Sequence, residues 1–444
     1  MKTAIINGTL VNEGKTFRAD IIVENDTIVS ITDKANEREL DECKVIDAEG
    51  MYVIPGVIDD HVHFREPGLT HKGDMAEGSR AAAAGGVTSF MDMPNVIPPT
   101  TTLASMHDRQ EIGAEKSLVN YSFYLGAAND NFYDIRHAYP VSICVLKVFM
   151  GSSTGNLLID DRKNLERIFA ESPLIIATHC EDNDIIEHNL QHFRSIYGDN
   201  IPPECHPLIR SREACLKSSR LAVELARKYN NRLHILHLTT EEEINLLDKG
   251  DLSSKRITGE ACVQHLWFND SAYKEKGNFV KCNPAIKKES DRQALLKAVN
   301  GGIIDVVATD HAPHTIEEKS GIYTKAASGA PMVQHSLAVM LELAERGETT
   351  FTTIVERMSH TPAKLFRITK RGFLRTGYKA DICIFKKEAW TVDKSNILYK
   401  CGWSPLEGVS LNYKVQTTLV NGRIVYDKGL FDDSVKGEML EFEM

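Results

Sequence analysis

The middle of the chain, from about residue 55 to residue 367, alternates short apolar runs with stretches of helical composition. The runs expected to form strands are Val57-Ile58, Gly86–Met91, Ser142–Met150, Leu174–Thr178, Leu233–Leu238 and Ile303–Thr309. The stretches expected to form helices are Ser79–Ala84, Arg162–Glu171, Arg212–Lys228, Glu241–Leu247 and Arg292–Val299. Alternation of this kind predicts βα units around a parallel sheet.

Both ends of the chain read differently, as short strands joined by tight turns. Asn-Gly pairs, which favour hairpin turns because both residues tolerate positive φ, occur at Asn7-Gly8 and Asn421-Gly422. The strands expected beside turns are Thr3–Ile6, Thr9–Val11, Asp20–Val23, Thr27–Ile31, Thr417–Val420 and Arg423–Tyr426. We therefore expect residues 1–54 and 368–444 to form one composite β domain, with residues 55–367 as the α/β domain.

Composition excludes several classes of protein. The 444 residues carry a net charge of −10, which argues against a nucleic-acid or anionic-membrane surface. The longest apolar run is too short to cross a bilayer. Nine scattered cysteines, with no CxxC pair, are expected to be free thiols in a reducing cytoplasm. These features indicate a globular cytoplasmic protein and leave its chemistry open.

The segment Asp59-Asp60-His61-Val62-His63-Phe64-Arg65 is the richest in chemistry. At the end of a strand, the two-residue period places His61, His63 and Arg65 on one face. Two imidazoles beside a guanidinium suit a metal ion with an anionic ligand next to it. Taken alone, the pair of histidines is equally compatible with a packed or surface position.

Four later polar residues interrupt or follow apolar strands, namely Lys147, His179, His237 and Asp310. Counted from His63, the successive spacings are 84, 32, 58 and 73 residues. At roughly 30–40 residues per βα unit these positions belong to strands one, four, five, six and eight. In a parallel barrel the carboxyl ends of the strands converge on one face, where active sites form.

Each of these residues also has a plain structural interpretation. Lys147 can extend its ammonium from a strand end, His179 can be a hydrogen-bonded core histidine, and Asp310 can cap a turn. His234 competes with His237 for one position, and we prefer His237 because it lies nearer the end of its strand. The coincidence of all these residues at strand ends favours a joint metal site.

The chain resembles the cyclic-amidohydrolase branch of the amidohydrolase superfamily, and most closely the dihydroorotases. The most specific segments are His61–Gly68, Met93-Pro94-Asn95, Thr178–Asp182 and Asp310–His314. The resemblance extends over nearly the whole length. It implies a distorted (β/α)8 TIM barrel with a small β-sandwich domain formed from both termini.

The resemblance also implies roles for the residues already singled out. His61 and His63 would bind the more buried zinc, and His179 and His237 the second. Asp310 would bind zinc and act as the catalytic base. Lys147 would be carboxylated by CO2 and bridge the two zinc ions, which explains why a lysine points at two cations. Some bacterial dihydroorotases have aspartate at this position, and Lys147–Met150 is more similar to the hydantoinase version.

Substrate choice is expected to depend on Arg65, Asn95 and His314, with Asn283 as a further contact to the ring. An arginine with polar neighbours suits the ring carboxylate of dihydroorotate. The implied activity is reversible zinc-dependent hydrolysis of L-dihydroorotate to N-carbamoyl-L-aspartate in de novo pyrimidine biosynthesis. The alternatives are a hydantoinase or allantoinase, and a scaffold relative without catalysis. A homodimer is the assembly that the family implies.

A small polar loop, residues 151–156, follows Lys147 at the same end of the barrel. Its composition suits a mobile lid that donates hydrogen bonds to bound substrate. An ordinary βα loop is an equally good interpretation.

Overall fold

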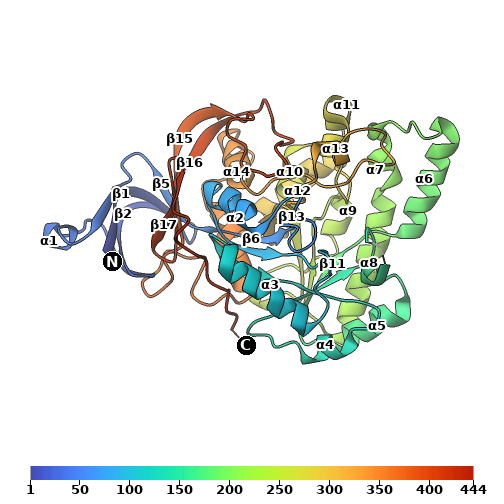
Figure 1. Ribbon diagram of the computed structural model, residues 1–444, viewed down its shortest axis with the longest axis horizontal. Coiled ribbons are helices and arrows are strands. Elements are labelled where there is room, and N and C mark those ends of the chain that lie inside the picture. The colour runs from blue at the N-terminus through green and yellow to red at the C-terminus, as the bar shows by residue number, and fades with distance from the viewer. Residues whose placement is uncertain (1, 154, 444) are drawn as a thin grey trace.

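Strands from the N-terminal and C-terminal parts of the chain form one mixed sheet at one side of the molecule (Figure 1). The computed structural model describes residues 2–153 and 155–443. The sheet runs in the order β18-β17-β16-β15-β5-β1-β2-β3, and β4 pairs with β1. Its strands are β1 (Lys2–Asn12), β2 (Lys15–Glu24), β3 (Thr27–Thr32), β4 (Lys44–Asp47), β5 (Tyr52–Pro55), β15 (Ile382–Thr391), β16 (Ser410–Val420), β17 (Arg423–Asp427) and β18 (Leu430–Phe431). The antiparallel pairing of β5 with β15 joins the N-terminal strands to the C-terminal strands.

The Asn-Gly turn at Asn421-Gly422 is confirmed, because β16 ends at Val420 and β17 begins at Arg423. The hairpin expected at Asn7-Gly8 is wrong. Strand β1 continues through both residues with a β-bulge, where the Asn7 amide donates to Asp20 Oδ1 at 2.8 Å. The side chain of Asp20 replaces a backbone partner there, so the strand does not need to reverse.

The barrel strands follow in chain order around a ring. They are β6 (Val57–Val62), β7 (Val87–Asp92), β8 (Asn120–Phe123) with β9 (Leu125–Gly126), β10 (Val145–Phe149), β11 (Ile175–His179), β12 (Leu233–Ile235), β13 (Ile257–Cys262) and β14 (Val306–Ala308). All neighbouring pairs are parallel. The ring closes where His63 donates its backbone N–H to the carbonyl of His311 at 2.8 Å. With β8 and β9 taken as one interrupted strand, the described residues contain eight strand positions.

Helices cover the outside of the barrel (Figure 1). They are α2 (Met75–Ala84), α3 (Leu103–Lys116), α4 (Phe132–His137), α5 (Arg162–Glu171), α6 (Asn183–Tyr197), α7 (His206–Ile209), α8 (Arg212–Tyr229), α9 (Glu241–Ile244), α10 (Val263–Trp267), α11 (Ala272–Lys276), α12 (Glu289–Asn300), α13 (Ile316–Lys319), α14 (Ser336–Glu345), α15 (Phe351–Val355) and α16 (Thr361–Leu365), with α1 (Glu37–Leu40) in the β domain. Short 3-10 or π turns are η1 (Gly155–Leu157), η2 (Pro203–Cys205), η3 (Leu252–Ser254), η4 (Gly277–Val280) and η5 (Glu356–His360). The architecture is the expected (β/α)8 barrel with a small β domain.

Two of the barrel strands have no counterpart among the expected strands. Strand β13 contains Gly259 and Glu260, and β8 begins with Asn120, so neither is a continuous apolar run. Both strands are nevertheless fully buried, because helices cover one side and the barrel interior the other. Burial on two faces permits polar residues only where other groups in the barrel satisfy them.

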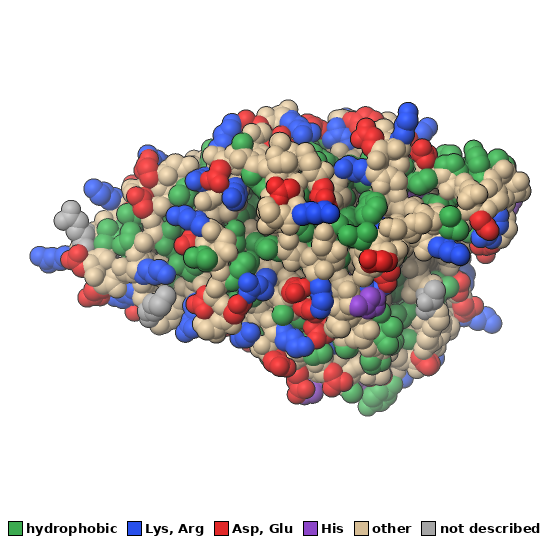
Figure 2. Space-filling model, turned by 45° about the horizontal axis from the view of Figure 1, so that its top comes forward, with side chains coloured by type: hydrophobic (Ala, Val, Ile, Leu, Met, Phe, Trp, Pro, Cys, Tyr) green, Lys and Arg blue, Asp and Glu red, His purple; other side chains and the backbone are tan. Residues whose placement is uncertain are grey.

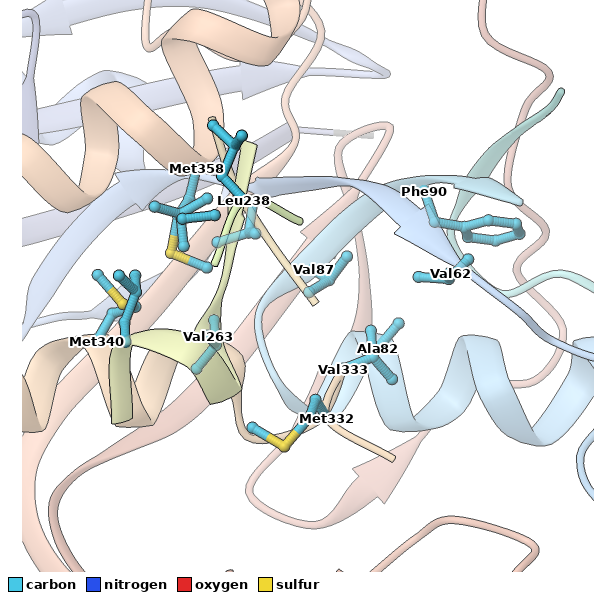
Figure 3. Close-up of a cluster of buried hydrophobic side chains, with 14 of the residues drawn as sticks. Val62, Ala82, Val87, Phe90, Leu238, Val263, Met332, Val333, Met340 and Met358 are labelled. Atoms are coloured by element: carbon cyan, nitrogen blue, oxygen red, sulfur yellow. The ribbon is translucent and has the colours of Figure 1, made fainter. Parts of the chain in front are cut away.

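The largest apolar core lies between the barrel strands and the helices around them. Figure 3 shows part of it, where Val62 and Phe90 from β6 and β7 lie near Ala82 of α2 and Val333, just before α14. These side chains are fully buried. Burial of each Val or Phe side chain contributes about 1.5–3 kcal/mol of hydrophobic stabilisation. This packing holds the strands at fixed positions beneath the site.

Acidic and basic side chains are interspersed on the face shown in Figure 2. Within the described residues, no helix combines the length and the apolar character that a membrane span requires.

The C-terminal segment leaves the sheet after β18 and lies against the barrel. The Leu440 amide donates to the carbonyl of Tyr121 in β8 at 2.8 Å, and Leu440 is fully buried. We propose that the chain divides near residues 54/55 and 367/368, with this last segment crossing from one domain to the other.

Gly86 tests the contact between barrel and sheet. Its φ is +80°, and a Cβ atom there would lie 2.5 Å from Cys383 Sγ in β15. Gly347 has a similar φ of +76°, with no described atom within 4 Å of such a Cβ. Gly347→Ala should lower the free energy of unfolding by about 1 kcal/mol through backbone strain alone. Gly86→Ala should cost about 1–3 kcal/mol more through the added clash, measured from urea unfolding curves. Equal losses in the two variants would contradict a tight junction at this point.

Candidate metal centre

The residues proposed as metal ligands lie at the carboxyl ends of the barrel strands. His61 lies in β6 and His63 follows it, Lys147 lies in β10, and His179 ends β11. His237 and Asp310 each lie two residues beyond the ends of β12 and β14. These are the first, fourth, fifth, sixth and eighth strand positions, as the spacing predicts. All six side chains are buried, with Lys147 only 1% exposed.

His61, His63 and Asp310 form the tightest group. Asp310 Oδ1 lies 3.2 Å from His61 Nε2 and 3.0 Å from His63 Nε2. Burial alone would raise the pKa of Asp310, but the two imidazoles hold it well below its usual range. Two imidazole nitrogens and a carboxylate oxygen converging on one point are a donor set that zinc prefers.

His237 and His179 extend this group towards β10 and β11. The His237 ring centre lies 5.3 Å from that of His61 and 4.5 Å from that of His179. Lys147 Nζ lies 4.7 Å from the centre of the Phe149 ring. The four imidazoles thus form a continuous chain of nitrogen donors across the end of the barrel.

Lys147 is the least expected member of the group. It makes no ion pair within residues 2–153 and 155–443, and burial lowers its pKa to about 8. Burial disfavours the ammonium form, and the charges of Asp310 and Glu260 offset only part of that cost. A lysine with a lowered pKa carries more of the neutral amine, which is the form that reacts with CO2. The residues present therefore fit a metal pair bridged by a carbamate.

Glu260 is a site residue that the sequence reasoning missed. It lies in β13 and is fully buried. Its Oε1 atom lies 2.9 Å from His61 Nδ1 and accepts the His237 backbone N–H at 3.0 Å. The contact fixes the His61 ring so that Nε2 points at Asp310, and such outer contacts orient metal-binding histidines. The sequence pattern did not indicate Glu260, because β13 is too polar to be predicted as a buried strand.

Glu181 supports His179 in the same way. Its Oε2 atom lies 2.8 Å from His179 Nε2, which leaves Nδ1 of that ring for another partner. Arg210 pairs with the same carboxylate. The neighbouring Asp182, and not Glu181, caps helix α6 by accepting the Ile185 amide at 3.0 Å.

His234 and His237 are clearly separated by the structure. The His234 ring nitrogen Nδ1 lies 2.9 Å from Thr258 Oγ1, and Nε2 lies 3.5 Å from Asp60 Oδ2 in the barrel interior. Only His237 contacts the rings of His61 and His179. This placement agrees with the preference for His237.

The expected substrate residues lie beside the His61–Asp310 group. Arg65 is buried, and its Nη2 atom lies 3.2 Å from His314 Nε2 while Nε donates to the Pro313 carbonyl at 3.1 Å. Arg65 has no ion pair among the described residues. Burial, with the charges of Arg65 and Lys72, lowers the pKa of His314 to about 3, so its ring is neutral at pH 7. His314 Nδ1 lies 3.0 Å from Glu318 Oε2, whereas the Arg65 guanidinium has no carboxylate at ion-pair distance in the described structure.

Asn95 and Asn283 are placed differently from one another. Asn95 Oδ1 lies 2.8 Å from His63 Nδ1, so this amide holds a proposed metal ligand. Asn283 Oδ1 is buried and has no hydrogen-bond partner in the described structure. Among the described residues, Asn283 forms no hydrogen bond with Arg65 or His314.

Loop 151–156 contacts the second half of the site. The Ser152 hydroxyl donates to Glu181 Oε2 at 2.8 Å. Thr154, which belongs to the proposed lid, lies outside the described residues.

Three of the site residues have a strained backbone. Arg65, His237 and Asp310 have φ values of +68°, +39° and +45°, a region that residues other than glycine seldom adopt. Such conformations persist only where the surrounding structure enforces them, and they cluster at functional sites.

Comparison with known proteins identifies the family of this chain. The amidohydrolase family model matches residues 52–425. A dihydroorotase of Methanosarcina acetivorans is 31% identical over 441 residues, covering 95% of this chain and 92% of that protein. An allantoinase of Bacillus velezensis is 31% identical over 425 residues, covering 94% and 92%. The structure of an L-hydantoinase from Arthrobacter aurescens superposes with a TM-score of 0.92 at 25% identity, covering 99% of each chain. The chain therefore belongs to the amidohydrolase family and is a metal-dependent cyclic amidohydrolase.

Proposed function

We propose that this enzyme is a dihydroorotase, which reversibly hydrolyses L-dihydroorotate to N-carbamoyl-L-aspartate in pyrimidine biosynthesis. The observation that carries the proposal is Arg65, a buried guanidinium next to the His61–Asp310 group with no carboxylate partner among the described residues. A buried unpaired charge is costly, and a substrate carboxylate would compensate it. Several similar proteins, including one from Pyrococcus abyssi at 31% identity, are named dihydroorotase.

We further propose that the site holds two zinc ions bridged by carboxylated Lys147. His61 and His63 would bind one ion, His179 and His237 the other, and Asp310 would complete the set. Bound zinc supplies a Lewis acid that activates water and polarises the amide carbonyl. We also propose a cytoplasmic homodimer acting on small molecules and not on nucleic acid.

The chain's own residues then have separate tasks. Arg65 holds the ring carboxylate, and the neutral His314 accepts from Arg65 Nη2 and so orients the guanidinium. Asn283 offers its unpartnered Oδ1 atom to the ring. Asp310 accepts the proton of the attacking water and returns it to the departing ring nitrogen, acting first as base and then as acid. Glu260 and Glu181 keep two imidazoles in the orientation that this chemistry requires.

A hydantoinase-type activity is the second candidate, because the superposition with the Arthrobacter hydantoinase covers the whole fold. Consumption of L-dihydroorotate, hydantoin and allantoin should be measured in parallel, with a chelator-treated control. We expect turnover of dihydroorotate alone, abolished by the chelator. Turnover of another ring would retain the metal centre and refute the substrate. No turnover of any ring, with zinc bound and the fold intact, would favour a scaffold protein without catalysis.

Arg65→Met should lower kcat/KM for dihydroorotate roughly 100-fold or more, because it removes the partner of a desolvated carboxylate. Arg65→Lys should recover part of the loss, since an ammonium keeps the charge but not the planar fork. Arg80→Met, at a partly exposed arginine paired with Asp433, is the matched control and should leave kinetics unchanged. Unchanged kinetics in Arg65→Met would remove Arg65 from the substrate site.

Because the proposed bridge is a carbamate formed from Lys147 and CO2, zinc uptake by the protein should depend on CO2. Metal-free protein should recover two zinc ions per chain in bicarbonate buffer and fewer in CO2-free buffer, because the bridge cannot form without the carbamate. Lys147→Ala should bind fewer than two ions in either buffer. Zinc content by elemental analysis checks both results. Full zinc uptake without CO2 would contradict the carbamate bridge.

A further inference from the structure

Three arginines gather at the opposite end of the barrel from the metal centre. Arg232 immediately precedes β12 and Arg256 immediately precedes β13, and these strands are neighbours in parallel register, with Leu233 beside Ile257. Arg367 follows α16 and lines the same cavities. This group, the basal arginine cluster, therefore lies where the strands begin and the proposed ligands lie where they end.

The charges of the basal arginine cluster are not compensated. None of the three arginines forms an ion pair within residues 2–153 and 155–443, although most of the described arginines do. Their side chains donate only to neutral backbone carbonyls, Arg232 to Leu365 at 2.6 Å and Arg256 to Asn230 at 2.8 Å. Burial, and then the charges of Arg367 and Arg256, lower the pKa of Arg232. The guanidinium groups thus repel one another in a chain whose net charge is −10.

Arg367 has an unfavourable backbone as well. Its φ is +57°, a conformation that costs an arginine free energy and costs a glycine none. The position therefore combines backbone strain with charge repulsion. The side chain is exposed, so water screens part of the repulsion, whereas the backbone strain remains.

The cluster lines two surface cavities. One, of about 280 Å³, also contains Ser172 and Asn231 over a floor that includes Phe366. The other, of about 500 Å³, contains the same three arginines with Ser253 and Ser254. Hydroxyl and amide groups therefore accompany the guanidinium groups. Asn231 Oδ1 is buried and has no hydrogen-bond partner in the described structure.

Three other charged side chains line these cavities, and none neutralises the arginines. Lys255, in the larger cavity, pairs with Asp305 at 2.7 Å. Lys364 adds a further cation to the larger cavity, and its ammonium lies 3.2 Å from Glu356. Glu443 lines the smaller cavity without forming an ion pair with an arginine in the described structure. The net charge of both cavities remains positive.

We propose that the basal arginine cluster binds the phosphate group of a small molecule, at a site separate from the metal centre. Guanidinium groups match phosphate oxygens through paired N–H donors, and a phosphate dianion has enough oxygens to engage all three. The smaller cavity exceeds the volume of one phosphate, so a short phosphate ester also fits. Bound phosphate relieves the repulsion, and the protein is stabilised in proportion to its occupancy.

Calorimetric titration of the zinc-loaded enzyme with inorganic phosphate tests the proposal, with sodium chloride at equal ionic strength as the reference. We expect saturable binding of about one phosphate per chain, with a rise in the thermal midpoint that chloride does not produce. A parallel titration with ribose 5-phosphate distinguishes a phosphate ester from free phosphate as the ligand. Tighter binding than inorganic phosphate identifies an ester as the ligand, and equal affinity identifies free phosphate.

The double variant Arg232→Gln/Arg367→Gln should lower phosphate affinity at least tenfold. Arg423→Gln in β17, which removes another arginine without an ion pair in the described structure, should keep the affinity of the parent protein. Arg367→Gly should raise the thermal midpoint in the absence of phosphate and weaken the response to it, because strain and repulsion disappear together. Undiminished binding in the folded double variant would overturn the proposal, as would the absence of saturable binding to the parent protein.

Discussion

Closure of the barrel is the constraint on which the site depends. The hydrogen bond from the His63 amide to the His311 carbonyl joins the eighth strand position to the first. It brings Asp310, almost 250 residues away along the chain, between the imidazoles of His61 and His63. The apolar core around β6 and β7 then holds this register, since a shift of one residue would turn each histidine to the other face of its strand.

Electrostatics gives the two ends of the barrel different characters. At the carboxyl ends of the strands, the carboxylates of Glu260 and Glu181 bind the imidazoles of His61 and His179 and orient them. The negative charge there therefore has partners within the chain. At the opposite end, the basal arginine cluster forms no ion pair among the described residues, and Arg256 and Arg367 are exposed to solvent. The unpaired charge is buried at Arg65, and we propose an anionic ligand in both places.

Much of the site was predictable because its residues lie at the ends of recognisable strands. Lys147, His179 and Asp310 each follow or interrupt a β-rich apolar run, and their spacing matches whole βα units. Glu260 was not predictable in this way, because it lies within a polar strand. The hairpin predicted at Asn7-Gly8 failed for a related reason. The side chain of Asp20 accepts the hydrogen bond of the Asn7 amide, which a turn would otherwise have satisfied.

The sequence by itself determined the alternation of strands and helices, the participation of both termini in one sheet, and the order of the site residues around the barrel. These depend on local pattern and spacing, which every segment carries with it. Only the tertiary structure decided that Glu260 holds His61 and that three arginines share a cavity. Contacts of this kind depend on side-chain direction and on burial between segments far apart in the chain, and no local pattern records them.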